Sequence, residues 1–432
     1  MPTVPASSPR SACPAALPSS QSLRAIPADE PVPLHGMSPL LVITLLAMLL
    51  GLQPITTDLY LPILPLLTEQ LHAQVAHTQL TLSALLLAFG CSQLVWGPVS
   101  DRFGRRPVLL AGLSLYVLSA AGCALAADMQ WLIVWRTVQG VAMGAGVMAA
   151  RAIVRDLYSP VAGAQAMSKA MSGLGVIACA SPFAGSLLAQ YFGWRATMAT
   201  LAVFGTITLV LVALRFRESL PAPQPHATQP RQLLRTWRSI VSHPTFLAYS
   251  ATTTGTYAGL FTFLAGSSFT FIEVLGWSAR DVGLLLSVNG ACYIGGTVLC
   301  RRLLPRWGVK NTVAFAGVLA VLGTGTMLVC ALLGVRNGWA YALPFTLFMV
   351  AHGIQQPCGQ SGSVSAFPKA AGTAAAVNGF VMMLVAFAVG AWLGRHLDGT
   401  VFPLVFGVSF WSLWTALASW TLVRRWGTPP AP

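Results

Sequence analysis

Long runs of uncharged, apolar residues constrain this chain more than any other feature of its sequence. Val108–Ala127 is one such run of 20 residues. An α-helix rises about 1.5 Å per residue, so a run of this length crosses the roughly 30 Å hydrocarbon core of a bilayer. Comparable runs recur along a chain in which only 8% of residues are charged, whereas soluble domains carry about 25%. The sequence therefore predicts an all-α membrane protein that crosses the bilayer many times.

Apolar windows, separated by Gly, Pro and charged residues, predict twelve transmembrane helices in two groups of six. These are expected near residues 39–66, 79–99, 107–127, 131–151, 170–189, 196–214, 246–272, 282–300, 312–333, 338–358, 372–394 and 400–422. The expected organisation is a disordered tail (1–37), a six-helix bundle (38–214), a linker (215–245), a second six-helix bundle (246–425) and a short tail (426–432). Met37 is an alternative start of translation.

The basic residues are distributed unequally between the two sides of the predicted membrane. Twenty of the 25 Lys and Arg residues lie on the side that holds both termini and the linker, and four lie on the other side. By the positive-inside rule, the termini and the linker are expected in the cytoplasm. This distribution explains the net charge of +14 without a nucleic-acid partner.

The short loop in "WGPVSDRFGRRPVLL" concentrates charge between two apolar runs. A topology signal alone would not need Asp101, or glycines at Gly97 and Gly104 that allow close backbone approach. An acid beside three arginines favours a specific ion pair. A degenerate copy, "CRRLLPRWGVKN", follows the eighth predicted helix, with Arg306 and Gly308 in corresponding places. A repeated six-helix unit of this kind is typical of secondary transporters.

Several of these motifs resemble those of the major facilitator superfamily, and more narrowly of the Bcr/CflA group of bacterial drug:proton antiporters. "GPVSDRFGRRP" resembles the superfamily's loop motif, and "WLIVWRTVQGVAMGAG" its fourth-helix motif, with Arg136, Gln139 and Gly140 in place. "TTDLYLPILP" resembles the first-helix signature of twelve-span drug antiporters, in which Asp58 is the acid. "RDLY", "GLFTFLAGSSFTFIEVLGWS" and "FPKAAGTAAAVNG" add local likeness. The resemblance covers about residues 38–425.

The fifth predicted helix departs from the antiporter motif. Where that motif has Gly-Pro followed by a glycine pair, this chain has "CASPFAGS", with Ser181 before Pro182 and a single Gly185. Pro182 and Gly185 keep the kink and the close packing that the motif implies. The departure weakens the motif as a marker of antiport.

Two charges are expected within the membrane, where a charge costs roughly 2.5–3.5 kcal/mol on insertion scales. Asp58 and Arg136 are expected at similar depth in the outer half of the bilayer, in the first and fourth helices. The resemblance implies that Asp58 is the proton-coupling site and a substrate contact, and that Arg136 tunes its affinity for the proton. The alternative is that Asp58 is a solvated acid near an outer helix end.

The resemblance assigns the loop between the second and third helices to a cytoplasmic gate. Asp101 is expected to pair with a basic group or a helix terminus across the seam between the two bundles, with Arg102, Arg105, Gly97 and Gly104 in the same gate. The alternative is that the loop is a topology signal only.

Other polar residues of the predicted spans support two interpretations. They either line a cavity or form hydrogen bonds between helices, each worth about 0.6 kcal/mol on average. These residues are Gln53, Asn289, His352, Gln355, Gln356 and Asn378. The cysteines lie in or beside apolar runs and are expected to be reduced packing residues.

The predicted function is therefore a secondary active multidrug exporter of the bacterial inner membrane. It would couple proton influx to the efflux of small drug-like molecules by alternating access, as a monomer in the lipid bilayer. The alternative is a transporter of a metabolite such as an amino acid or sugar. The sequence has no phosphate-binding loop and no spacing typical of metal ligands, so we expect no cofactor, no metal and no enzyme.

Overall fold

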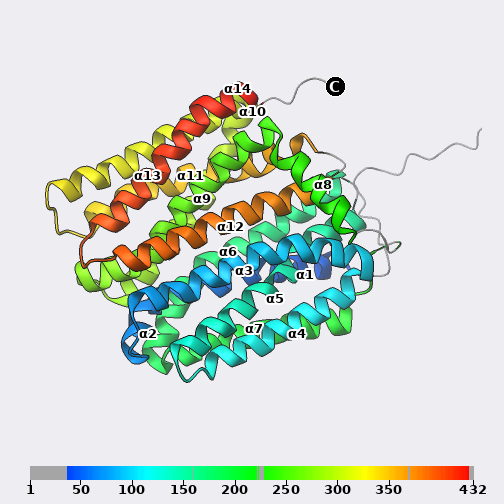
Figure 1. Ribbon diagram of the computed structural model, residues 1–432, viewed down its shortest axis with the longest axis horizontal. Helices are drawn as coiled ribbons and strands as arrows, with labels where there is room; N and C mark the ends of the chain where they lie inside the picture. Colours follow the sequence, from blue (N-terminus) through cyan, green and yellow to red (C-terminus); the bar gives the residue numbers. More distant parts are fainter. Residues whose placement is uncertain (1–36, 159, 221, 223–227, 368–369, 428–432) are drawn as a thin grey trace, which may run out of the picture.

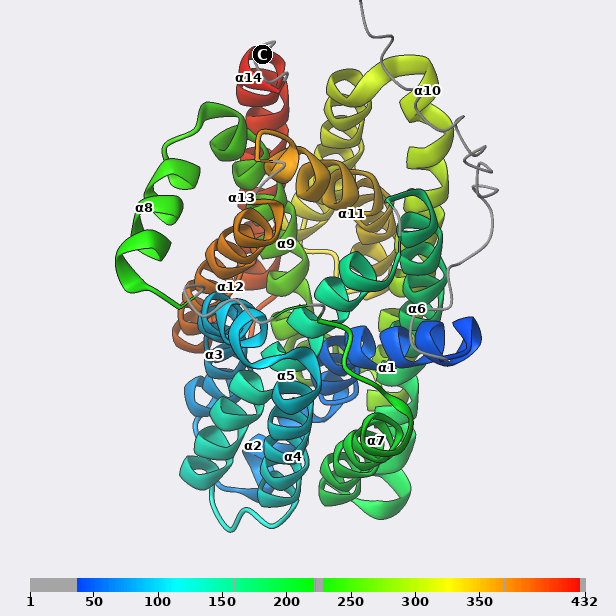
Figure 2. The ribbon, with the colours of Figure 1, turned by 90° about the vertical axis from the view of Figure 1, so that its right-hand side faces the viewer.

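The computed structural model describes residues 37–158, 160–220, 222, 228–367 and 370–427, and every regular element among them is a helix (Figure 1). The predicted tails therefore lie outside the described residues, except Met37 and the segment 426–427. The helices run side by side in two groups, and Figure 2 views them from the end that carries the linker. We call this the linker end and the opposite one the far end.

The first half of the chain contains the six predicted spans. The first span is divided into α1 (Pro39–Asp58), the short η2 (Leu61–Ile63) and α2 (Leu64–Gln70). The others are α3 (Val75–Phe103), α4 (Arg105–Ala124), α5 (Met129–Leu157), α6 (Pro160–Phe192) and α7 (Trp194–Arg215). Each extends beyond the predicted range at one or both ends, because polar residues continue the helices past the apolar windows.

The second half contains the other six spans. They are α9 (Pro244–Phe269) with the π-helical η3 (Thr270–Val274), α10 (Ala279–Leu332), α11 (Trp339–Ser365), α12 (Ala371–His396) and α13 (Phe402–Ala418), which continues through η5 (Ser419–Val423) into α14 (Arg424–Trp426). The 54-residue α10 bends at Gly308, whose φ of 68° is not helical. It therefore comprises the eighth and ninth predicted spans as two arms.

Ten of the described helices are long and apolar enough to cross a membrane. One of them is the bent α10, which supplies two crossings, and the more polar α11 is the remaining predicted span. The prediction of an all-α protein with twelve spans in two bundles is thus confirmed by the arrangement of helices.

The linker contains a helix that the sequence analysis did not predict, α8 (Pro230–Val241). Its arginines are exposed, whereas Ile240 is fully buried with Phe246 of α9 and with Ala374 and Val377 of α12. The sequence contains a signal for this helix, because the spacing of Leu233, Trp237 and Ile240 puts the three apolar side chains on one helical face. The prolines and arginines that exclude a transmembrane span do not exclude a surface helix.

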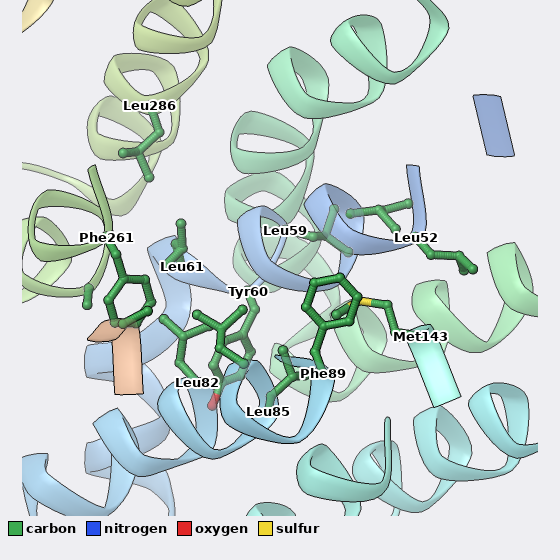
Figure 3. Packing of buried hydrophobic residues seen from close by; sticks show 14 of the residues in the cluster. Leu52, Leu59, Tyr60, Leu61, Leu82, Leu85, Phe89, Met143, Phe261 and Leu286 are labelled. Atoms are coloured by element: carbon green, nitrogen blue, oxygen red, sulfur yellow. The ribbon is translucent and has the colours of Figure 1, made fainter. Parts of the chain in front are cut away.

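The two bundles pack along α3 against α12 and along α6 against α10. One continuous cluster of buried apolar side chains joins them. Figure 3 shows part of this cluster, in which Leu61 of η2 and Leu82 of α3 lie beside Phe261 of α9. Both described chain ends lie at the linker end. The sulfur of Met37 accepts a hydrogen bond from the Arg217 N–H, and the Gly427 carbonyl accepts one from Tyr249.

Candidate functional site

The break in the first span positions Asp58. Pro62 has no N–H, and its ring would clash with the carbonyl of the residue four positions earlier, which is Asp58. The α-helix accordingly ends at Asp58, and the chain turns into η2. The Thr57 hydroxyl donates a 2.7 Å hydrogen bond to the Asp58 carboxylate.

Asp58 lies between the two bundles. Its half-buried carboxylate is within electrostatic range of Cys179 on α6 and Tyr257 on α9, which belong to different halves of the chain. Gly185 of α6 packs directly against the Leu59 carbonyl, where a Cβ would collide with that oxygen. The small residue of "CASPFAGS" thus allows α6 to approach the break beside Asp58. This position does not fit a carboxylate facing the lipid.

Arg136 is fully buried and approaches the same break from α5. Its guanidinium donates hydrogen bonds to the Gln139 side-chain oxygen at 2.9 Å and to the Thr56 carbonyl at 3.1 Å. Its central carbon lies 4.3 Å from the centroid of the Tyr60 ring. Asp58 and Arg136 therefore lie near the same turn of α1, but they form no ion pair among the described residues.

The other residues of the two helical motifs have packing roles. Gly140 of α5 lies directly against the Leu85 backbone of α3, where a Cβ would overlap the Leu85 carbonyl oxygen. Pro182 lies inside α6, and the neighbouring Ser181 hydroxyl bonds to the Ile177 carbonyl at 2.6 Å. Gln139 orients Arg136, so the predicted motif residues contact the structure around Asp58 rather than the carboxylate itself.

The far end is closed by hydrogen bonds between the bundles. The Ser268 hydroxyl of α9 donates to the Leu61 carbonyl of η2 at 2.6 Å. The Gln79 amide of α3 donates to the Ala265 carbonyl, also at 2.6 Å. Both bonds are buried, where a hydrogen bond is costly to leave unmade. Together they close the seam between the two bundles at the far end.

At the linker end, Asp101 belongs to a compact ion-pair cluster. Its carboxylate lies 2.7 Å from Arg105 and 3.5 Å from Arg155. Arg105, only 1% exposed, also binds Asp156 at 2.8 Å and the Ser100 hydroxyl at 3.0 Å. Asp101 therefore pairs with basic groups, whereas the pairing expected for it is one across the seam. Its described partners lie within the first bundle rather than across the seam.

The remaining residues of the predicted gate lie around this cluster. Gly104 adopts a φ of 100°, which lets α3 end and α4 begin within one residue. A Cβ at Gly97 would lie 3.6 Å from the Met148 side chain, an ordinary van der Waals contact, so close packing does not require glycine at this position. Arg102 points away from the cluster and donates a 2.8 Å hydrogen bond to Thr228 of the linker. Arg102 thus contacts the linker, a contact that its predicted role in the gate did not include.

Two acids that the sequence analysis did not select complete this region. Asp156 lies in "RDLY", a segment noted only for its family likeness. Glu218 follows α7 and accepts the backbone N–H groups of Arg105 at 2.9 Å and Arg106 at 3.0 Å. Partial burial alone would raise the pKa of Glu218, but hydrogen bonds from the backbone N–H groups of Leu220, Arg105, Arg106 and Ser219 hold it below its ordinary value. No local pattern connects Glu218 to a helix start over a hundred positions earlier.

Of the polar residues predicted either to line a cavity or to form hydrogen bonds between helices, those of the second bundle fall into two groups. Asn378 accepts a hydrogen bond from Thr253, and His352 bonds to Thr256 at 2.9 Å, so both connect helices. The amide groups of Asn289 and Gln355 are buried and have no hydrogen-bond partner among the described residues. No group of three or more potential metal ligands occurs in the part of the chain that the structure describes.

Comparison with known proteins identifies the family. The model of the Major Facilitator Superfamily matches residues 46–391. Multidrug resistance protein D of Escherichia coli strain K12 is 29% identical over 78% of this chain and 84% of its own length. The chloramphenicol resistance protein of Pseudomonas aeruginosa is 26% identical over 74% of this chain and 75% of its own length. A bicyclomycin resistance protein homolog of Haemophilus influenzae is 24% identical over 90% and 97%.

Solved structures agree on the fold. The D-xylose–proton symporter superposes with a TM-score of 0.67 at 17% identity, over 89% of this chain and 98% of that one. The human organic anion transporter MFSD10 gives a TM-score of 0.65 at 21% identity, over 89% and 99%. The resemblance recognised in the sequence motifs is confirmed by the family match and by these drug-resistance relatives. The chain belongs to the Major Facilitator Superfamily.

Proposed function

We propose that this protein is a proton-coupled exporter of small drug-like molecules that works by alternating access between its two six-helix bundles. The observation that carries the proposal is the position of Asp58, at the break of the first span and between α6 and α9. An ionisable group held between two bundles of a membrane protein is a functional-site candidate because lipid offers it no solvation. Relatives named for multidrug, bicyclomycin and chloramphenicol resistance support the substrate class.

Asp58 would exchange its proton for the substrate. A protonated carboxyl is neutral and a deprotonated one is charged, so the two forms favour different arrangements of α1, α6 and α9 around it. Arg136 fixes the Thr56 carbonyl and thereby the turn that carries Asp58. A change at the carboxylate is transmitted to η2, whose Leu61 carbonyl takes part in the closed seam at the far end.

The cluster of Asp101, Arg105, Arg155 and Asp156 would act as the gate at the linker end. It fixes the turn between α3 and α4 against α5, and Gly104, with its positive φ, allows that turn. We further propose that the linker end faces the cytoplasm of a bacterial cell and that the protein lies in the inner membrane as a monomer. On this proposal the bundles span 38–214 and 246–425, and the protein is a transporter rather than an enzyme.

Everted membrane vesicles test the proposal. A drug that is a substrate should release protons from vesicles holding a preformed pH gradient, and Asp58→Asn should abolish this release while Glu69→Gln, which removes an exposed acid at the far end, leaves it intact. Both variants must be present in the membrane in equal amounts. Proton release that persists in Asp58→Asn would remove Asp58 from the mechanism.

A further inference from the structure

The structure contains a cavity of about 900 Å³ at the linker end, between the two bundles and beneath the linker helix. From the first bundle it is lined by α3 and α5, from the second by the start of α12, and from the linker by α8. Figure 2 shows these elements around the same region of the linker end. The cavity is large enough to hold a drug-sized molecule.

One helical face of α5 contributes Met148, Arg151, Ala152 and Arg155 to the cavity. Their spacing of three and four residues puts them on a single stripe, so the Arg151 side chain faces the same space as Arg155. Arg151 lies about 15 residues beyond Arg136, which is roughly 22 Å along the helix. The cavity is therefore well separated from Asp58.

The charges that line the cavity do not balance. Among the described residues they are two aspartates, Asp101 and Asp156, and three arginines, Arg105, Arg151 and Arg155, which gives a formal net charge of +1. Both aspartates are engaged by Arg105 and Arg155. Arg151 forms no hydrogen bond or ion pair with any residue that the structure describes.

The wall from the second bundle adds a second source of positive potential. The first turn of α12, Ala371–Thr373, lines the cavity, and the Arg155 guanidinium lies 3.5 Å from the position of a Cβ on Gly372. The α12 start has no side-chain cap at Ala370 and no acidic residue in its first turn. The free N–H groups of such a helix start attract anions.

We propose that Arg151 recognises an anionic group of the transported molecule, so that small organic anions or zwitterions enter from the linker end. A carboxylate or sulfonate would accept charge-assisted hydrogen bonds from the Arg151 guanidinium, and its charge would be stabilised by the α12 N-terminus. This inference rests on the proposed transport function and narrows its substrate class.

Two dyes with the same ring skeleton and opposite charge test the proposal. Fluorescein is anionic and rhodamine 123 is cationic at neutral pH, and binding of each to the purified full chain in neutral detergent is measured by fluorescence polarisation. Fluorescein should bind more tightly, and Arg151→Gln should weaken it about tenfold or more, the loss of a charged hydrogen bond. Rhodamine 123 should bind no more weakly to this variant than to the wild type.

Two further variants separate recognition from folding. Arg151→Lys keeps the charge and should recover most of the fluorescein affinity. Arg235→Gln removes an exposed arginine of α8 that does not line the cavity, and it should leave fluorescein binding unchanged. Equal fluorescein affinity in the wild type and Arg151→Gln would overturn the proposal. So would binding of short-chain phosphatidylglycerol at Arg151 without binding of fluorescein, which would assign the site to a lipid headgroup.

The failure of this inference is distinguishable from that of the proposed function. Fluorescein binding through Arg151 without substrate-driven proton release would retain the anion site and reject proton-coupled export. Proton-coupled export would be retained and the anion site rejected if the wild type exports a substrate in exchange for protons but Arg151→Gln prefers fluorescein over rhodamine 123 as strongly as the wild type does.

Discussion

Glu218 accepts the backbone N–H of Arg105 across a 2.9 Å hydrogen bond, which ties the beginning of the linker to the first turn of α4. The same Arg105 donates its side chain to Asp156 of α5 and pairs with Asp101 at the end of α3. One residue thus connects the linker with three helices of the first bundle. The loop that carries the family motif is therefore also the attachment point of the linker, and its stability depends on residues outside the motif.

Glu218→Ala is expected to lower the stability of the first bundle by about 1 kcal/mol, because two N–H groups at the α4 start lose their acceptor. Thermal unfolding of the purified protein in detergent measures the effect as a lower Tm. Glu218→Gln keeps one acceptor oxygen and should fall between the wild type and Glu218→Ala. An unchanged Tm in Glu218→Ala would show that water replaces the carboxylate without loss.

The contribution of Glu218 is also expected to depend on pH. Its pKa in the folded state is held below the ordinary value of 4.5, so the ionised form is stabilised by folding. The stabilisation is complete above pH 4.5, decreases below that value and is lost once the pH falls through the folded-state pKa. The Tm difference between the wild type and Glu218→Ala should therefore shrink in acid. A difference that grows on acidification would contradict this assignment.

Arg105→Gln is expected to be more damaging, by about 3–5 kcal/mol, since it removes the buried cation that Asp101 and Asp156 share and leaves them only the exposed Arg155. Asp156 is largely buried, at 7% exposure of its side chain. The double variant Arg105→Gln with Asp156→Asn should be less destabilised than the sum of the single changes, because it removes the uncompensated charge. Comparison of Tm for the four proteins measures this coupling, and simple additivity would argue against a direct pair.

The sequence predicts the helices of this protein better than their contacts. Apolar run lengths locate the spans, because each helix must satisfy its own backbone hydrogen bonds in lipid. The same argument gives no position for α8, which does not span the membrane and packs its apolar face against Phe246 of α9 and Ala374 and Val377 of α12. Span prediction also does not show that the eighth and ninth spans follow each other with only a sharp bend at Gly308 between them.

In the candidate site, too, the residues are easier to predict than their contacts. Asp58 and Arg136 are predictable because charges are rare within apolar runs. The contacts of Arg136 are not predictable, since it binds the Thr56 carbonyl and the Tyr60 ring rather than the Asp58 carboxylate. The sequence predicts a basic partner for Asp101 but places it across the seam, whereas Arg105 lies four residues away in the next helix. Asp156 and Glu218 reach Arg105 only through the tertiary fold.

Gly185 provides a test of the packing around Asp58 that leaves all charges in place. A Cβ at this position would overlap the Leu59 carbonyl, so Gly185→Ala must push α6 away from the break in the first span. We expect a stability loss of about 1–3 kcal/mol and impaired substrate-driven proton release. The matched control is Gly295→Ala in α10, where nothing lies within 4 Å of the new Cβ. That change should raise helix propensity without a clash and leave Tm equal or higher. If Gly185→Ala retains both Tm and proton release, then the close contact between α6 and Leu59 does not position Asp58, and the coupling site tolerates a wider separation of the two helices.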